Sequence, residues 1–266
     1  MSYLKLIWKT NKGFTIFSMV FIGLFQLMIL FLVTTFDTQA MLSSVITQLP
    51  ENLRIFLNDS FFNMLTFDGA AAFGFNHPIV LSLLAIVAIT IPVRHISREI
   101  ENGNMELMLS LPFRRKSLIL KLWLSGTMVL GLIILTSFLA SIASMELFHQ
   151  LSWKTVFRLL QIVLNLWLLF VLVMSYTLLF AGIMKGGGFS GNISAMITLI
   201  FYLLFFIGQL WKDASFSLYL NVFNYYQPQK IMFGSENFLI DNLVLALLSL
   251  LLLLLSLNRF EKRDIP

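Results

Sequence analysis

The sequence predicts an all-α integral membrane protein with six transmembrane helices and both termini on the cytoplasmic side. Of its 266 residues, 58% are hydrophobic and only 12% are charged, whereas soluble domains contain about 25% charged residues. The mean hydropathy is +0.88, and six long stretches carry no ionised side chain. A soluble globule of this length would need far more polar surface. Soluble enzymes and nucleic-acid-binding modules are therefore excluded, despite a pI of about 9.5.

The six apolar stretches form one predicted transmembrane domain over residues 1–266. They are residues 14–36, 77–93, 122–145, 159–184, 192–211 and 242–258. Most reach the length of about 20 residues that crosses a ~30 Å hydrocarbon core. The first stretch is longer than the ~7–15-residue core of a signal peptide and no cleavage motif follows it, so we expect a retained helix.

The segment before the first span, residues 2–12, carries Lys5, Lys9 and Lys12 on one helical face. This pattern is typical of a short amphipathic helix that lies along the cytoplasmic interface. An unstructured basic flank explains the three lysines equally well.

The orientation follows from the distribution of Lys and Arg between the two sets of flanking segments. The N-terminus, residues 94–121, Lys185 and the C-terminal tail together hold 13 basic and 5 acidic residues. The loops 37–76, 146–158 and 212–241 hold 5 basic and 8 acidic residues. The first set is therefore predicted to be cytoplasmic, which makes this a multi-pass protein of the cytoplasmic (inner) cell membrane.

Several kinds of site are missing from the sequence. The predicted spans contain no Asp, Glu, Lys or Arg, and ion-coupled transporters usually carry such groups near the middle of the membrane. There is no cysteine, and the three histidines have no metal-site spacing. No Lys-Ser or Lys-Thr pair follows the glycines of a phosphate-binding loop. We therefore expect no catalytic residue, metal or cofactor in this chain.

The densest cluster of charge lies between the second and third spans, in residues 94–121. Apolar residues recur there at steps of 4, 7 and 4, which predicts a helix with an apolar stripe. The members of this stripe are Ile96, Ile100, Leu107 and Leu111. The glutamates that lie off the stripe are Glu99, Glu101 and Glu106. Gly103 permits a bend between two helical pieces, Pro112 ends the segment, and Arg114 and Lys121 mark the start of the third span.

Such a helix is suited to insert into a cleft on a soluble partner. Its apolar residues would supply contact area and its carboxylates would fix the orientation. The alternative is a loop that lies on the lipid surface. Three glutamates beside anionic headgroups favour the docking interpretation over that alternative.

The stretch REIENGNMELMLSLPFR at residues 98–114, followed by Lys121, resembles the cytoplasmic loop of type 2 ABC-transporter permeases, the exporter class. Those permeases show a Glu pair, a Gly with a small polar residue, Glu, an aliphatic pair, and then Leu-Pro-x-x-Arg. Asn104 replaces the commoner Thr, and Phe113 replaces a small or β-branched residue. The resemblance extends to six spans, inside termini, a long first external loop and a re-entrant region before the last span.

The resemblance implies that this segment is the coupling helix that docks on an ATP-binding cassette ATPase. Two ATPase subunits, which hold the ATP and Mg, would pair with this permease and a second one, identical or paralogous. The neutral Phe- and Met-rich spans favour a hydrophobic or amphipathic substrate such as a peptide, a lipid or a drug. The alternative is a non-transporting assembly or sensor subunit that docks another cytosolic partner.

A serine motif, Gly188-Phe189-Ser190-Gly191, is similar to the nucleophile motif of rhomboid-type intramembrane proteases. Catalysis by Ser190 would need a histidine base from a later helix, but all three histidines precede residue 150. We interpret these residues as a Gly-rich turn between the fourth and fifth spans. The spacings Gly182/Gly186 and Gly187/Gly191 would allow close packing of helix backbones.

Overall fold

The computed structural model describes residues 3–35, 66–106, 115–184, 187–210, 216, 218–219, 221–234 and 238–263. The regular secondary structure of these residues is entirely helical. Six helical segments are long and apolar enough to cross a membrane: Ile7–Thr35, Phe67–Glu101, Arg115–Leu147, Trp153–Ile183, Gly188–Gln209 and Phe238–Glu261. The predicted all-α fold with six membrane-capable helices is confirmed.

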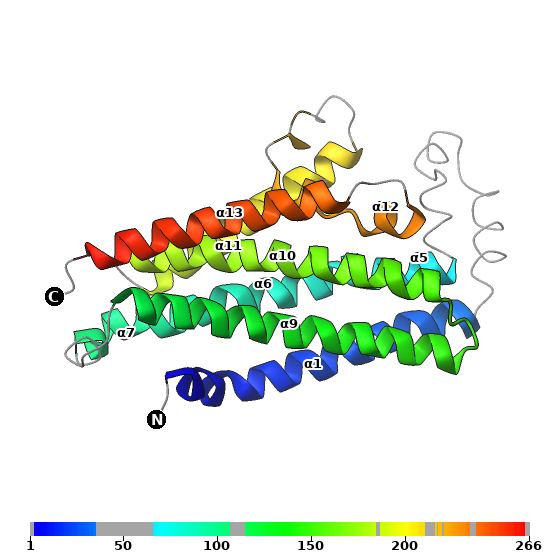
Figure 1. Ribbon diagram of the computed structural model, residues 1–266, viewed down its shortest axis with the longest axis horizontal. Helices are drawn as coiled ribbons and strands as arrows, with labels where there is room; N and C mark the ends of the chain where they lie inside the picture. The colour runs from blue at the N-terminus through cyan, green and yellow to red at the C-terminus, as the bar shows by residue number, and fades with distance from the viewer. Residues whose placement is uncertain are drawn as a thin grey trace.

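The long helices form one bundle around a central helix (Figure 1). They are α1 (Tyr3–Thr35), α6 (Pro78–Pro92), α9 (Arg115–Leu147), α10 (Trp153–Ile183), α11 (Gly187–Leu210) and α13 (Phe238–Glu261). Helix α10 is the most buried of the membrane-capable helices and contacts α6, α9, α11 and α13. Two indoles fasten it to α9, since Trp123 Nε1 donates to Ser175 Oγ at 2.8 Å and Trp167 Nε1 to the Thr127 carbonyl at 2.9 Å.

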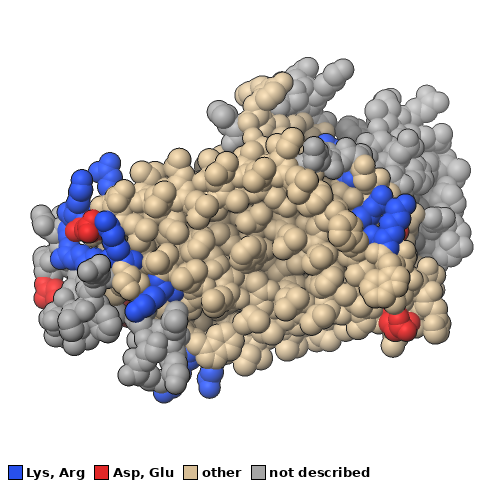
Figure 2. Space-filling model, in the orientation of Figure 1, with Lys and Arg blue, Asp and Glu red and all other residues tan. Residues whose placement is uncertain are grey.

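The two ends of the bundle differ in what they carry. One end, called the α7 end below, holds the start of α1, the end of α13 and the short helix α7 (Arg98–Glu101). The opposite end, the α5 end, holds α5 (Phe67–Asn76) and α12 (Pro228–Phe233). On the face shown in Figure 2, charged side chains gather at these ends and a broad uncharged band lies between them. This band is the surface that a bilayer would cover.

The second membrane-capable segment is broken near its α5 end. Helix α5 begins after Thr66, whose side chain accepts a hydrogen bond from Gly69 N. The chain is extended at His77 and becomes helical again from Pro78, because a residue before proline is disfavoured in the α conformation. Pro78 then occupies the first turn of α6, where its missing N–H costs nothing. The sequence prediction placed residues 67–76 in a loop and missed α5.

Five of the long helices begin before the predicted spans, namely α1, α9, α10, α11 and α13, whereas α6 lies within its predicted span. Helix α9 has 33 residues and a length of about 50 Å at 1.5 Å per residue, which exceeds a ~30 Å hydrocarbon core. Hydropathy marks only the part of a helix that suits lipid, whereas backbone hydrogen bonding continues into the charged flanks.

The predicted interface helix is not a separate element. Residues 3–12 are the first turns of α1, without a break. Lys9 and Lys12 are exposed, whereas Ile7 and Asn11 are buried inside the chain. The polar face of this segment is therefore confirmed for Lys9 and Lys12, and its buried face continues into the first span.

The segment before α13 folds back over α5. It contains the 3-10 helix η3 (Val222–Tyr225) and α12. The buried Tyr226 hydroxyl donates to the Phe75 carbonyl at 3.1 Å, and Gln229 Nε2 donates to the Gly69 carbonyl at 3.0 Å. These contacts hold α12 and the residues before it against α5 at this end of the bundle.

Candidate functional site

The predicted docking region begins as a continuation of α6. The π-helix η1 (Val93–Ser97) follows Pro92 directly, and α7 (Arg98–Glu101) follows η1. The amides of Asn102 and Gly103 donate to the carbonyls of Arg98 and Ile100. Gly103 has a φ of +72°, the left-handed conformation with which helices commonly end. A further helical turn covers residues 104–106, so the predicted bend at Gly103 is confirmed.

The residues from 98 to 106, called the docking segment below, present a polar surface at the α7 end. Glu101, Gly103 and Glu106 are exposed, while Glu99 and Ile100 are partly exposed. Asn104 Nδ2 donates to Glu99 Oε2 at 2.9 Å, which orients this carboxylate along the segment. The carboxylates predicted to contact a partner therefore lie on one short, accessible stretch.

The apolar stripe is only partly described. Ile96 is fully buried in the core of this chain, because η1 packs against α6, α10 and α11. It therefore has no exposed surface with which to contact a partner. Leu107, Leu111, Pro112 and Arg114 lie outside the described residues. Lys121 is half-buried in α9, several residues after the start of that helix.

A cluster that sequence reasoning missed joins three helices at the α7 end. Arg263 Nη1 donates to the carbonyls of Ala181 and Gly182, and its Nη2 donates to that of Met184. These carbonyls lie at the end of α10, where no further helical N–H groups are available to bond them. Arg115 Nη1 in turn donates to the Arg263 carbonyl at 2.6 Å. The sequence signal for this cluster is a basic residue just after the last predicted span, because an Arg side chain can bond the free carbonyls at the end of a helix.

Ser190 is not in a turn, and that prediction is wrong. It lies in the first turn of α11, fully buried, with its Oγ 2.7 Å from Ser97 Oγ in η1. A serine hydroxyl supplies no base for nucleophilic catalysis. Gly191 permits a close approach here, because a Cβ at this position would lie 3.4 Å from Val93 Cγ2. The absence of a side chain at Gly191 thus lets the Val93 side chain pack against α11.

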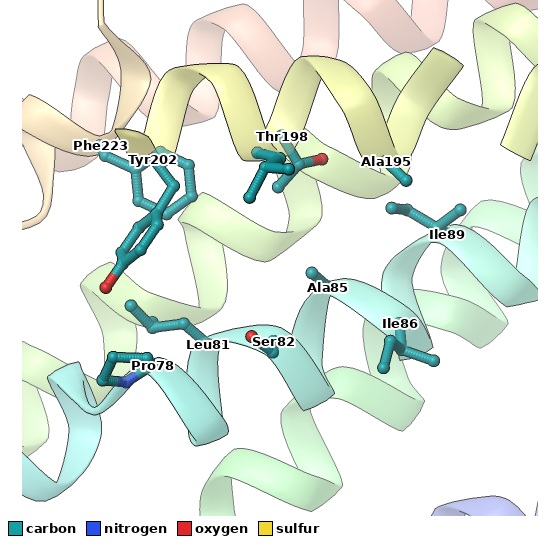
Figure 3. Close-up of a pocket in the computed structure, with 11 residues that line it drawn as sticks. Pro78, Leu81, Ser82, Ala85, Ile86, Ile89, Ala195, Thr198, Tyr202 and Phe223 are labelled. Carbon is teal, nitrogen blue, oxygen red and sulfur yellow. The ribbon is translucent and has the colours of Figure 1, made fainter. Parts of the chain in front are cut away.

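A groove of about 270 Å³ lies between α6 and α11 (Figure 3). Its walls are apolar apart from three hydroxyl-bearing side chains, Ser82, Thr198 and Tyr202. Tyr202 packs edge-to-face on Phe223 of η3, with ring centroids 5.7 Å apart, at the end of the groove that also holds Pro78. Ile86 and Leu199 are about half exposed, so the groove opens toward the outside of the bundle.

A metal centre finds no support in the part of the chain that the structure describes. No three His, Asp or Glu side chains come close enough there to hold an ion. His95 is instead bonded to Asn11, with 2.9 Å between His95 Nε2 and Asn11 Nδ2.

Comparison with protein families assigns the chain. The model of a family described as "ABC-2 family transporter protein" matches residues 13–265. The protein belongs to this ABC-2 family. A search of curated proteins finds no match to the sequence.

The assignment confirms the type 2 permease class to which the 98–114 motif pointed. The chain is therefore an ABC-2 permease and a multi-pass membrane protein. Members of this family are transmembrane components that associate with ABC ATPase subunits.

Proposed function

We propose that this ABC-2 permease is the membrane-spanning subunit of an ATP-binding cassette exporter in the cytoplasmic membrane. It would move a hydrophobic or amphipathic substrate, such as a peptide, a lipid or a drug, with ATP hydrolysed by separate ATPase subunits. A second permease, identical or paralogous, would complete the pathway. The observation that supports this most is the docking segment, an exposed acidic stretch that continues directly from the membrane-capable helix α6.

The position of this segment would allow a movement of a soluble ATPase to be transmitted to the helix bundle. Glu101 and Glu106 stand at the α7 end, beside the two chain termini that the distribution of Lys and Arg assigns to the cytoplasm. Helices α6, η1 and α7 follow one another without a gap. A displacement of the docking segment is therefore applied to the end of a membrane-capable helix.

The substrate class rests on the groove between α6 and α11. Its walls are mostly Leu, Ile, Ala and Phe, and Ser82, Thr198 and Tyr202 add hydroxyl groups. Apolar walls with a few polar groups favour an amphipathic molecule over an ion or a sugar. The opening at Ile86 and Leu199 faces the surface that a bilayer would cover, so a molecule dissolved in lipid could enter from the side.

The test is co-purification of an ATPase with the tagged permease from its native membrane, followed by assay of Mg-ATP hydrolysis. We expect Glu101→Arg to lose the ATPase and its activity, because the reversed charge opposes the contact. Glu146→Arg is the matched control. Glu146 is also exposed, but it lies near the last residue of α9, at the α5 end of the bundle and away from Glu101.

Three outcomes would contradict the proposal. Retention of the ATPase by Glu101→Arg, or an equal loss in Glu146→Arg, would remove the docking segment from the interface. Capture of a cytosolic partner that does not hydrolyse ATP would indicate the assembly or sensor subunit instead.

A further inference from the structure

The π-helix η1 is the short element between the membrane-capable α6 and the docking segment. Pro92 has no N–H, so one α-helical hydrogen bond is missing at the end of α6, although the Val93 amide still donates to the Ile89 carbonyl. The Arg98 amide then donates to the Val93 carbonyl five residues earlier, which is the π-helical spacing. Isolated π turns occur frequently at functional sites. The contacts of η1 therefore bear on what the docking segment does.

On one side, η1 is bonded to α1 through Asn11. Asn11 Nδ2 donates to the Ile7 carbonyl at 2.8 Å, and Asn11 Oδ1 accepts from Arg94 Nη1 at 3.2 Å. These two bonds fix the orientation of the amide, so Nδ2 also faces His95 Nε2, at 2.9 Å. The imidazole nitrogen must accept this bond, which requires neutral His95 with its proton on Nδ1. Asn11 and His95 are only 3% and 6% exposed.

On another side, η1 is bonded to α11. The hydroxyls of Ser97 and Ser190 are 2.7 Å apart, and both side chains are buried. The Val93 side chain packs directly over Gly191. His95 and Ser97 are two residues apart, which is about half a turn of helix. They therefore point to nearly opposite sides, one to α1 and the other to α11.

We propose that η1 is a rigid joint that transmits displacement of the docking segment to α1 and α11 together. Asn11, His95, Ser97 and Ser190 are its positioning residues. The physical reason is that each contact is buried, so breaking it would leave polar groups without partners and without water. Moving α1 and α11 along with η1 keeps these bonds intact. The inference rests on the proposed function, because it requires an ATPase that moves the docking segment.

The test uses paired spin labels in the assembled transporter, with the permease labelled before the ATPase is added. This chain contains no cysteine of its own, so the label attaches only to the introduced cysteines. One pair joins the docking segment to α11 (Asn102→Cys with Leu203→Cys), and the other joins it to α13 (Asn102→Cys with Leu250→Cys). All three positions are exposed. Distances are measured by pulsed electron paramagnetic resonance with and without ATP and vanadate. We expect the distance to α13 to change and the distance to α11 to stay constant.

A variant with Asn11→Leu and Ser97→Ala should release the joint, so that ATP also changes the distance to α11. Because this variant could fail to fold, a second experiment uses Ser97→Cys with Ser190→Cys. Oxidation should link η1 to α11 covalently, since the two hydroxyls are already within 2.7 Å. We expect ATP hydrolysis by the oxidised complex to match that of the same complex after reduction.

The outcomes separate the two proposals. If no ATPase accompanies the permease, the proposed function fails. If an active complex shows an ATP-dependent change in the wild-type distance to α11, or no change to α13, the joint is wrong. Loss of ATP hydrolysis upon oxidation, with recovery after reduction, would show that the contact must open and would also overturn it.

Discussion

The amide of Gln26 in α1 occupies the space that a side chain at residue 74 in α5 would need. Gln26 Nε2 donates to the Ala71 carbonyl at 2.9 Å, and a Cβ built on Gly74 would overlap Gln26 Oε1. Gln26 is fully buried. This contact holds α5 against the first membrane-capable helix, and it explains why residue 74 is glycine.

Replacing Gly74 with alanine should destabilise the fold. The added methyl group would displace the buried Gln26 amide from its bond to the Ala71 carbonyl, and we expect a net cost of about 1–2 kcal/mol after the gain in helix propensity from alanine. Thermal unfolding in detergent, followed by circular dichroism, measures it. Gly13→Ala is the control, because nothing lies within 4 Å of that position in α1. It should leave stability unchanged or raise it by up to about 1 kcal/mol. Equal stability of the two variants would contradict the packing argument.

Removal of the Arg263 side chain should loosen the α7 end. Arg263→Ala takes away the donors that satisfy the terminal carbonyls of α10, and we expect a loss of about 1–3 kcal/mol. Arg263→Lys should recover only part of it, because an ammonium group lacks the planar fork of guanidinium. The same thermal unfolding assay applies. The neighbouring Lys262→Ala should change stability by less than about 0.5 kcal/mol, since Lys262 is exposed. A full recovery by lysine would mean that charge alone matters.

The backbone at Gly103 should control docking. Gly103→Val introduces a β-branched residue at φ +72°, a conformation that costs an L-residue about 1–2 kcal/mol. We expect α7 to end differently, and the amount of co-purified ATPase to fall. Gly103→Asn should retain the ATPase, because asparagine also adopts the left-handed conformation. Nothing lies within 4 Å of the position, so crowding would not explain a difference. Identical binding by the two variants would exclude a role for this turn.

Filling the α6–α11 groove should block transport without unfolding the protein. Ala195→Phe places a ring among the residues that line the groove, and we expect ATP-driven movement of a fluorescent phospholipid in proteoliposomes to fall. Its neighbour Met196 is exposed and does not line the groove, so Met196→Phe is the matched control and should transport normally. Unimpaired lipid movement in Ala195→Phe would remove the groove from the pathway.

The parts of the fold that were predictable are those governed by composition. A run of apolar residues has one stable solution across a bilayer, a helix with all its backbone hydrogen bonds satisfied internally. This is why six membrane-capable helices were found. The errors lie in segments whose hydropathy does not show whether they are helical. Helix α5 was missed because its residues, FDGAAAFGFN, have no long apolar run. The Gly-rich residues 188–191 were predicted to form a turn, but they belong to the first turns of α11.

The candidate site divides in the same way. Glu101, Gly103 and Glu106 were recognisable from their charge, spacing and conformational preference, and they are accessible in the structure. The periodicity that picked out Ile96 reports only that the residue is apolar and on one face of a helix. It does not say whether the neighbour is a partner protein or, as found here, the core of the same chain.

The sequence by itself determined that the protein is a helical membrane protein, which of its segments suit lipid, and where its scarce charges lie. These properties depend on single residues and their near neighbours. Only the tertiary structure decided that Asn11 meets His95 across 84 positions and that Ser97 meets Ser190 across 93. Pairings of this kind depend on which faces of distant helices pack together. A single polar residue in an apolar sequence forms no repeating pattern, so the sequence does not indicate which distant residue it contacts.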